Sequence, residues 1–220
     1  MKRILLTIIT LVGVSTAVFS QTINWRSFNA KQKHIIGLEA GWDYGLTFGA
    51  GYGYRLKTKL PILLNAAYSF PSGKTLFDDL KVKGGVQIEA CRVGGFSATL
   101  KAHGILRRFE NSYARLVNFG SAFAAVAGYY RPKWHAAGTI GFDKAIATHI
   151  SHSSGYLENV PNAQSAWYVP TGGNFHYGIQ AGISWRKTDV SIALGRMISQ
   201  GFETAPFIPY YANLGVNLRF

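Results

Sequence analysis

The chain has 220 residues, which suits one domain, and its single cysteine, Cys91, excludes an internal disulfide. Hydrophobic residues make up 48% and charged residues 15%, which is more natural for a barrel in lipid than for a soluble sandwich, because the outside of such a barrel must also be apolar. The formal charge of +13 favours anionic lipid or lipopolysaccharide phosphates as partners, and nucleic acid is excluded for an exported chain.

The N-terminus has the features of a secretory signal peptide. Lys2 and Arg3 precede an almost unbroken apolar run over residues 4–19. This pattern predicts a signal peptide over residues 1–20 with cleavage before Gln21, since the run is short for a retained membrane helix. No cysteine begins the mature chain, which excludes a lipoprotein anchor.

The remainder predicts a short leader followed by a barrel. Residues 21–33 are polar and aperiodic, and we expect them to form a periplasmic N-terminal leader. Beyond them, apolar and polar residues alternate with a period of two, which sends the two sets to opposite faces of a strand. The alternating stretches are residues 36–43, 46–56, 62–70, 82–90, 96–103, 115–130, 134–147, 174–186, 190–194 and 210–220. They predict an all-β chain, a closed antiparallel transmembrane β-barrel of ten strands over residues 34–220. Eight strands are the alternative, if the first hairpin or the 115–150 region is misread.

Connection lengths alternate as well, as in a barrel with short periplasmic turns and longer outer loops. Tight connections are expected near residues 57–60, 92–94, 131–133 and 186–188, and longer ones near 71–80, 106–114, 148–173 and 200–208, with 43–45 as the exception. Basic residues gather in the tight turns: Arg55, Lys57, Lys59, Arg92, Arg131, Lys133, Arg186 and Lys187. They predict a basic periplasmic rim, which serves either contact with inner-leaflet phosphates or another anionic partner, or only orientation and solubility.

The two faces of the predicted strands differ in chemistry. The side chains expected to point into the lumen include Glu39, Asp43, Arg55, Lys83, Glu89, Lys101, His103, His135, Asp143, His176, Gln180 and Arg219. Because small barrels are filled by their own side chains, we expect a polar network there, with a path for small solutes as the alternative. Cys91 is expected to be a small buried residue.

Aromatic residues near the strand ends predict two girdles at the headgroup layers. The outer girdle is expected to contain Trp42, Tyr44, Phe70, Phe175 and Tyr210, and the inner one Tyr52, Tyr54, Tyr129, Tyr130, Trp134, Trp185 and Phe220.

The 148–173 connection holds the candidate chemistry. Its His149-Ile150-Ser151 sequence resembles the His-x-Ser element of the outer-membrane lipid A deacylase barrels. The resemblance implies His149 as base, Ser151 as nucleophile and Glu158 as an orienting acid in acyl-ester hydrolysis. The family's Asn after the Ser is His152 here, and a register continued from 134–147 would point His149 into the lumen, away from lipid. We expect no metal site, since three residues on one loop are weak evidence for one, and no cofactor.

The last stretch, residues 210–220, alternates strictly and ends on Phe220. It resembles the C-terminal strand by which bacterial outer-membrane β-barrel proteins are recognised for assembly. The resemblance implies a small outer-membrane barrel of Gram-negative bacteria, located in the cell outer membrane. Its partners would be outer-membrane lipid, lipopolysaccharide and, through Phe220, the barrel-assembly machinery. The expected function is non-enzymatic, in binding, structure or small-solute transport, and a lipid A acyl-ester hydrolase is the alternative.

Overall fold

The computed structural model describes residues 22–220 except 43–44, 73–78, 161, 171 and 202–208. The expected signal peptide therefore lies outside the described residues, as do Asp43 and Tyr44. Helix is confined in the described part to two short segments, η1 (Trp25–Ser27) and α2 (Ser154–Asn159). Neither of these helices is long and apolar enough to cross a membrane.

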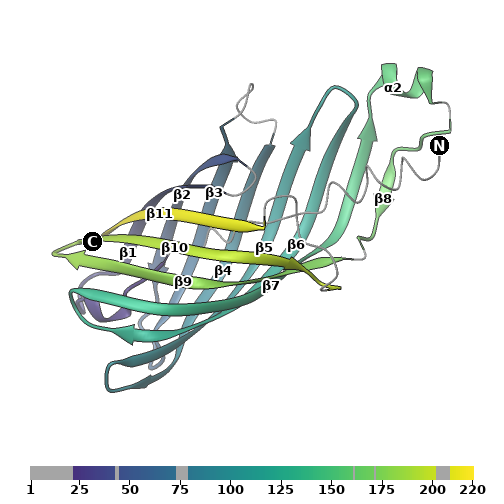
Figure 1. The fold of residues 1–220 in the computed structure, drawn as a ribbon. Coiled ribbons are helices and arrows are strands. Elements are labelled where there is room, and N and C mark those ends of the chain that lie inside the picture. The colour runs from purple at the N-terminus through teal and green to yellow at the C-terminus, as the bar shows by residue number, and fades with distance from the viewer. Residues whose placement is uncertain (1–21, 43–44, 73–78, 161, 171, 202–208) are drawn as a thin grey trace.

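The fold is a closed antiparallel β-barrel (Figure 1). Its strands are β1 (His34–Trp42), β2 (Leu46–Arg55), β3 (Ile62–Pro71), β4 (Asp79–Val93), β5 (Phe96–Glu110), β6 (Ala114–Tyr130), β7 (Trp134–His152), β8 (Ala166–Tyr168), β9 (Gly173–Trp185), β10 (Thr188–Ser199) and β11 (Tyr210–Arg219). β7 pairs with both β6 and β9, and β1 pairs with β11 to close the wall, whereas β8 only extends the far end of β7. The wall therefore has ten strands, as predicted, and the eight-strand alternative is wrong.

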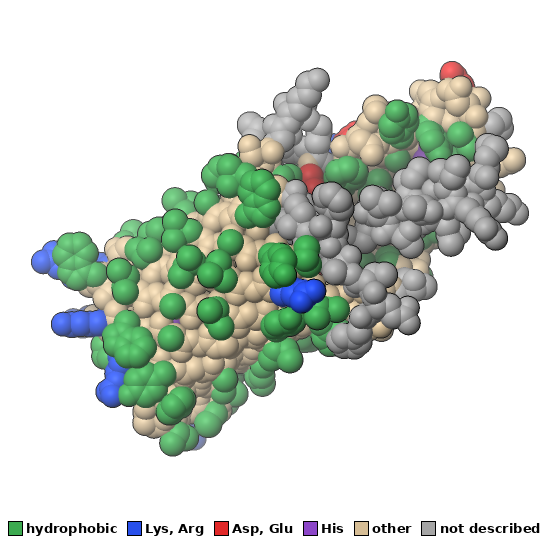
Figure 2. Space-filling model, viewed as in Figure 1, with side chains coloured by type: hydrophobic (Ala, Val, Ile, Leu, Met, Phe, Trp, Pro, Cys, Tyr) green, Lys and Arg blue, Asp and Glu red, His purple; other side chains and the backbone are tan. Residues whose placement is uncertain are grey.

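The outer wall is apolar and the lumen is polar. Leu38, Ile179 and Ile183 are each more than three-fifths exposed, at 63%, 66% and 65%. Figure 2 shows such hydrophobic side chains spread over the barrel wall. A continuous apolar surface of this kind would be an aggregation hazard in water but matches the lipid-facing band of a membrane-spanning barrel. The chain is thus a β-barrel of the outer-membrane type.

The two ends of the barrel differ in the lengths of their connections. The short-turn end carries connections 56–61, 94–95, 131–133 and 186–187 together with the C-terminus, and the long-loop end carries 43–45, 72–78, 111–113, 153–172 and 200–209. The expected alternation, with the short 43–45 connection as its predicted exception, is confirmed apart from the β5–β6 connection, where the predicted loop over 106–114 is wrong and only three residues turn the chain. The polar residues of this region form ion pairs between neighbouring strands: Arg107 of β5 binds Asp79 of β4, and Arg115 of β6 binds Glu110 of β5. These pairs allow β5 and β6 to continue beyond the apolar band.

Two β-bulges reset the alternation of faces. In β4 the pairing shifts between Glu89 and Cys91, and in β7 Ile146 is the extra residue opposite the Phe119–Gly120 step. An extra residue on one strand exchanges inward and outward positions beyond it. Cys91 is therefore exposed, and the prediction that it is buried is wrong.

Aromatic side chains line the outer wall near the short-turn end. Phe96 and Tyr129 pack edge to face at 5.2 Å, and Tyr129 lies 5.7 Å from Trp134 between ring centroids. Tyr130 was expected in this girdle but faces the lumen, where it is 2% exposed and stacks on His135. The girdle thus consists of the outward residues alone, because adjacent strand residues point to opposite faces.

Candidate functional site

The described N-terminal segment, residues 22–28, lies inside the short-turn end of the barrel (Figure 1) and is called here the N-terminal plug. Ile23 and Trp25 are buried and pack with Ile35 and Leu63 in an apolar cluster. Asn24 is fully buried and caps η1. The sequence predicts a periplasmic leader here but not its place in the lumen. The available signal was the presence of Ile23, Trp25 and Phe28 within a short stretch that is polar at its other positions.

Hydrogen bonds fasten the plug to strands on several sides of the wall. Trp25 Nε1 donates to Thr99 Oγ1 at 2.9 Å, and Asn24 Nδ2 lies 2.9 Å from both Ser184 Oγ and the carbonyl of Arg131. Asn217 Nδ2 in turn donates to the Thr22 carbonyl at 2.8 Å. Since these partners belong to β5, β9, β11 and the β6–β7 turn, the plug spans the lumen instead of lying along one strand.

A buried ion pair lies beside the plug. Arg219 Nε is 3.0 Å from Asp189 Oδ2, and the two residues are 1% and 2% exposed. Arg219 also donates to the carbonyls of Ser27 and Arg186, and Ser27 Oγ donates to Asp189 Oδ1 at 3.3 Å. The pair therefore joins β10 and β11 to the plug, and the inward position predicted for Arg219 is confirmed.

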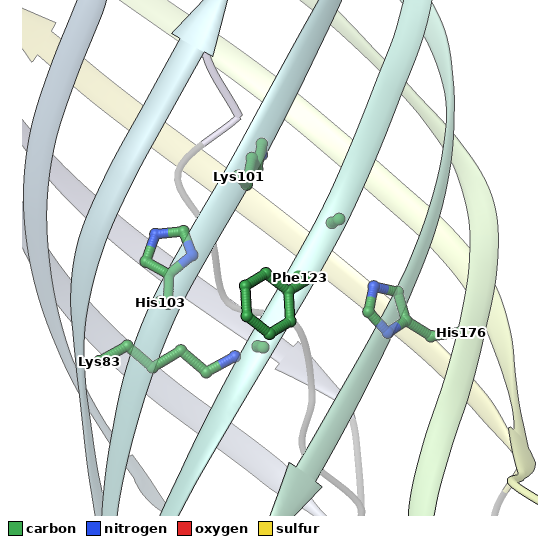
Figure 3. A pocket seen from close by; sticks show the side chains of 7 residues that line it. Lys83, Lys101, His103, Phe123 and His176 are labelled. Carbon is green, nitrogen blue, oxygen red and sulfur yellow. The ribbon is translucent and has the colours of Figure 1, made fainter.

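Deeper in the lumen, charged and polar side chains fill the space. Lys83, Lys101 and His103 face His176 across a small pocket (Figure 3), and each is at most 7% exposed. His103 Nε2 lies 3.1 Å from Asn65 Oδ1. The pocket encloses about 10 Å³, which is room for about one water molecule. The predicted inward positions of these residues are confirmed, and polar side chains crowd this part of the lumen.

Two lumenal histidines depend on glycines in the facing strands. His176 Nδ1 lies 3.5 Å from Asp143 Oδ1, and both side chains are buried. A Cβ at Gly141 would sit 2.3 Å from His176 Nε2, and one at Gly182 would sit 2.4 Å from the His135 ring. Both distances are far below a normal contact, so these glycines make room for the rings. The space beside these two inward glycines is thus occupied by the His176 and His135 rings.

His149 and Ser151 lie on the outward face of the wall at the long-loop end. The structure places Ser151 Oγ 3.2 Å from His149 Nδ1, and both residues belong to β7, not to a loop. The bulge at Ile146 turns them outward, so that Thr148 is the inward residue, bonded to Asn118 at 2.7 Å. The inward position expected for His149 from a continued register is therefore wrong.

The surroundings of this pair are aromatic on one side and charged on the other. The His149 ring lies 4.9 Å from that of Trp167, which also contacts Phe119 at 6.0 Å. Arg115 is the cross-strand partner of Ser151. Hydrogen bonds from Arg115 and then Arg108 lower the pKa of Glu110, beyond the apolar band, to about 2, so its carboxylate stays charged.

The proposed third member is not joined to the pair. Glu158 lies on α2, exposed, and no carboxylate of the described residues hydrogen-bonds His149. His152 stacks instead on Tyr156 at 4.9 Å. Among the described residues no group of three or more His, Cys, Asp or Glu could hold a metal ion. The arrangement is a Ser–His pair that lacks an orienting acid in the described part of the chain.

No family model and no curated protein matches the chain. Among solved structures, it is similar to the KdgM porin, with 8% identity and a TM-score of 0.40 over 84% of this chain and 99% of that one. It is also similar to the N-terminal barrel domain of Pseudomonas aeruginosa OprF (10% identity, TM-score 0.32, 86% and 100% covered). Yersinia pestis Ail gives 12% identity and a TM-score of 0.33, with the same coverage. These likenesses concern the barrel fold alone.

Proposed function

We propose that this chain is a non-enzymatic barrel of the outer membrane whose lumen is closed at rest, with a structural or binding role. The observation that carries the proposal is the N-terminal plug, which hydrogen-bonds to strands around the short-turn end. The polar side chains that crowd the lumen beyond the plug support it, because the pocket among Lys83, Lys101, His103 and His176 has room for only about one water molecule. In this assignment the short-turn end faces the periplasm and the long-loop end faces outward, as the general rule for such barrels predicts.

Conductance in a planar bilayer tests this function. We expect the purified wild-type barrel to give no stable ion conductance, because two layers, plug and network, block the lumen. A variant without residues 22–28 shows whether the plug or the polar network closes the lumen. Current steps in this variant would show that the plug closes it, and the absence of current would show that the network does. A second variant, Trp25→Ala, removes the buried ring of the plug, and its control is Trp167→Ala, the same substitution on the outer face, where Trp167 is 60% exposed. Steady conductance by the wild type would contradict the proposal of a closed barrel and would indicate a solute channel.

A second candidate function, acyl-ester hydrolysis in lipid A, has one observation in its favour. His149 and Ser151 are within hydrogen-bond reach of each other, at 3.2 Å, on the face where lipid would be met. A Ser nucleophile needs such a base, but the base also needs a group that orients it. No described carboxylate does so for His149, and this favours the non-enzymatic role.

Release of fatty acid from purified lipid A by the reconstituted barrel decides between the two functions. We expect none from the wild type. The set of variants is Ser151→Ala, His149→Ala and, as a neighbour on the same strand, His152→Ala. Acyl release that disappears in the first two and persists in His152→Ala would establish the hydrolase in place of the closed binding barrel.

A further inference from the structure

The short-turn end carries a ring of basic side chains with almost no acidic counterpart. Its cations are Arg26, Lys31, Lys33, Arg55, Lys57, Lys59, Arg131, Lys133, Arg186 and Lys187. Among the described acidic side chains at this end, Glu89 is already bonded to Arg92 and Asp189 to Arg219, and both acids are 2% exposed. Figure 2 shows Lys and Arg side chains projecting from the end where the C-terminus lies. This end therefore presents unneutralised positive charge.

Some of these cations lie on the aromatic girdle instead of extending into water. The guanidinium of Arg131 is 5.0 Å from the ring centroid of Tyr129 and hydrogen-bonds its hydroxyl. That of Arg186 is 5.4 Å from Trp185, which is 73% exposed on the outer wall. Outward Trp and Tyr rings of a barrel lie at headgroup depth. Arg131 and Arg186 are therefore held at the level of the lipid phosphates, at the perimeter of the barrel.

The backbone at Arg186 adds a second observation. Arg186 has a φ of 52°, and no other non-glycine residue in the described part of the chain has a positive φ. Glycine adopts this left-handed region without steric cost, whereas other residues are disfavoured there. A two-residue hairpin turn would thus fold more readily with Gly at this position. The turn carries an arginine on Trp185 in spite of the backbone cost, which points to a role for its charge.

We propose that Arg131 and Arg186 form a binding surface for the phosphate groups of anionic phospholipids in the leaflet at the short-turn end. The inference deepens the proposed function, because it rests on a barrel that spans the membrane. Guanidinium groups bind phosphate oxygens through paired hydrogen bonds, and the rings beneath fix their height. A soluble anion would be met equally well by lysines at the turn tips, so the girdle position favours lipid.

Lipid selectivity of the folded barrel tests the proposal. Wild-type barrel is reconstituted in phosphatidylcholine bilayers with spin-labelled phosphatidylglycerol or phosphatidylcholine, and the motionally restricted lipid fraction gives their relative association constants. One variant is Arg131→Gln with Arg186→Gln. Its control, Lys57→Gln with Lys59→Gln, removes the same charge from an exposed turn without ring contacts. Heat-modifiable migration shows that each barrel has folded, so failure of the surface is distinguished from failure of the fold.

We expect phosphatidylglycerol to be preferred by the wild type and by the lysine control, and the preference to fall by about fivefold or more in the arginine variant. Arg186→Gly is expected to lose preference while melting no earlier than the wild type, because it relieves the left-handed backbone. Equal loss in both double variants would reduce the effect to net charge and overturn the proposal, as would no preference in the wild type. Inorganic phosphate or polyphosphate that bound in phosphatidylcholine bilayers, and was lost in the arginine variant, would assign the surface to a soluble anion instead.

Discussion

Asp189→Ala is expected to lower the free energy of unfolding by about 3–5 kcal/mol, the cost of leaving one member of a buried ion pair without its partner. Arg219 is 1% exposed and lies 3.0 Å from Asp189, so removal of the carboxylate leaves a guanidinium with no charged partner in the described lumen. The loss also reaches the plug, because Ser27 is bonded to both members of the pair. Urea unfolding from lipid vesicles, followed by tryptophan fluorescence, gives the measurement.

The control separates a stranded charge from general loss of packing. Asp189→Leu combined with Arg219→Met removes both charges and keeps similar volume, and such replacements are often neutral. We expect the double variant to be clearly more stable than Asp189→Ala. If the two are equally unstable, packing accounts for the loss and the ion pair does not.

Ile179→Arg is expected to destabilise the barrel by about 2–4 kcal/mol if the site lies near the middle of the membrane. Ile179 is 66% exposed on the outer wall, so the charge would enter hydrocarbon. Its chain neighbour Gln180 is 7% exposed and faces the lumen, and Gln180→Asn should cost far less. The same unfolding experiment compares the two. Equal losses would mean that the assigned faces, or the membrane around them, are wrong.

The barrel itself could be predicted from the sequence because period-two alternation is a local pattern. The stretch from 174 to 186 shows this, since His176 and Gln180 are buried while Tyr177 and Ile179 are exposed, as expected. The buried positions of Lys83 and Lys101 followed from the same rule. Strand number and closure followed because the pattern persists along nearly the whole chain after the leader.

The errors of phase have one physical cause. A β-bulge needs no particular residue, so nothing in the sequence around Ala90 or Ile146 announces it, yet it exchanges the faces beyond it. This explains both the exposure of Cys91 and the outward position of His149 and Ser151. The contact between the latter two could be expected from their spacing, because residues two apart lie on one face of a strand.

The place of the plug could not be predicted because its contacts are remote in sequence. Asn24 bonds to Ser184, and Thr22 bonds to Asn217. No local pattern encodes such pairs. The buried Trp25 shows that a short polar segment can be fastened by one aromatic residue and a few amides.

The partners of the plug also have a consequence for the order in which contacts form during folding. Ser184, Asn217 and Arg219 belong to β9 and β11, the last part of the barrel to be synthesised. Until β11 pairs with β1, Thr22 and Ser27 do not have their partners Asn217 and Arg219 in position, and contacts of such long sequence separation form slowly. We therefore expect the first residues of the described chain to be among the last to reach their final positions, with the contacts of Thr22 and Ser27 formed only after the seam between β1 and β11 has closed.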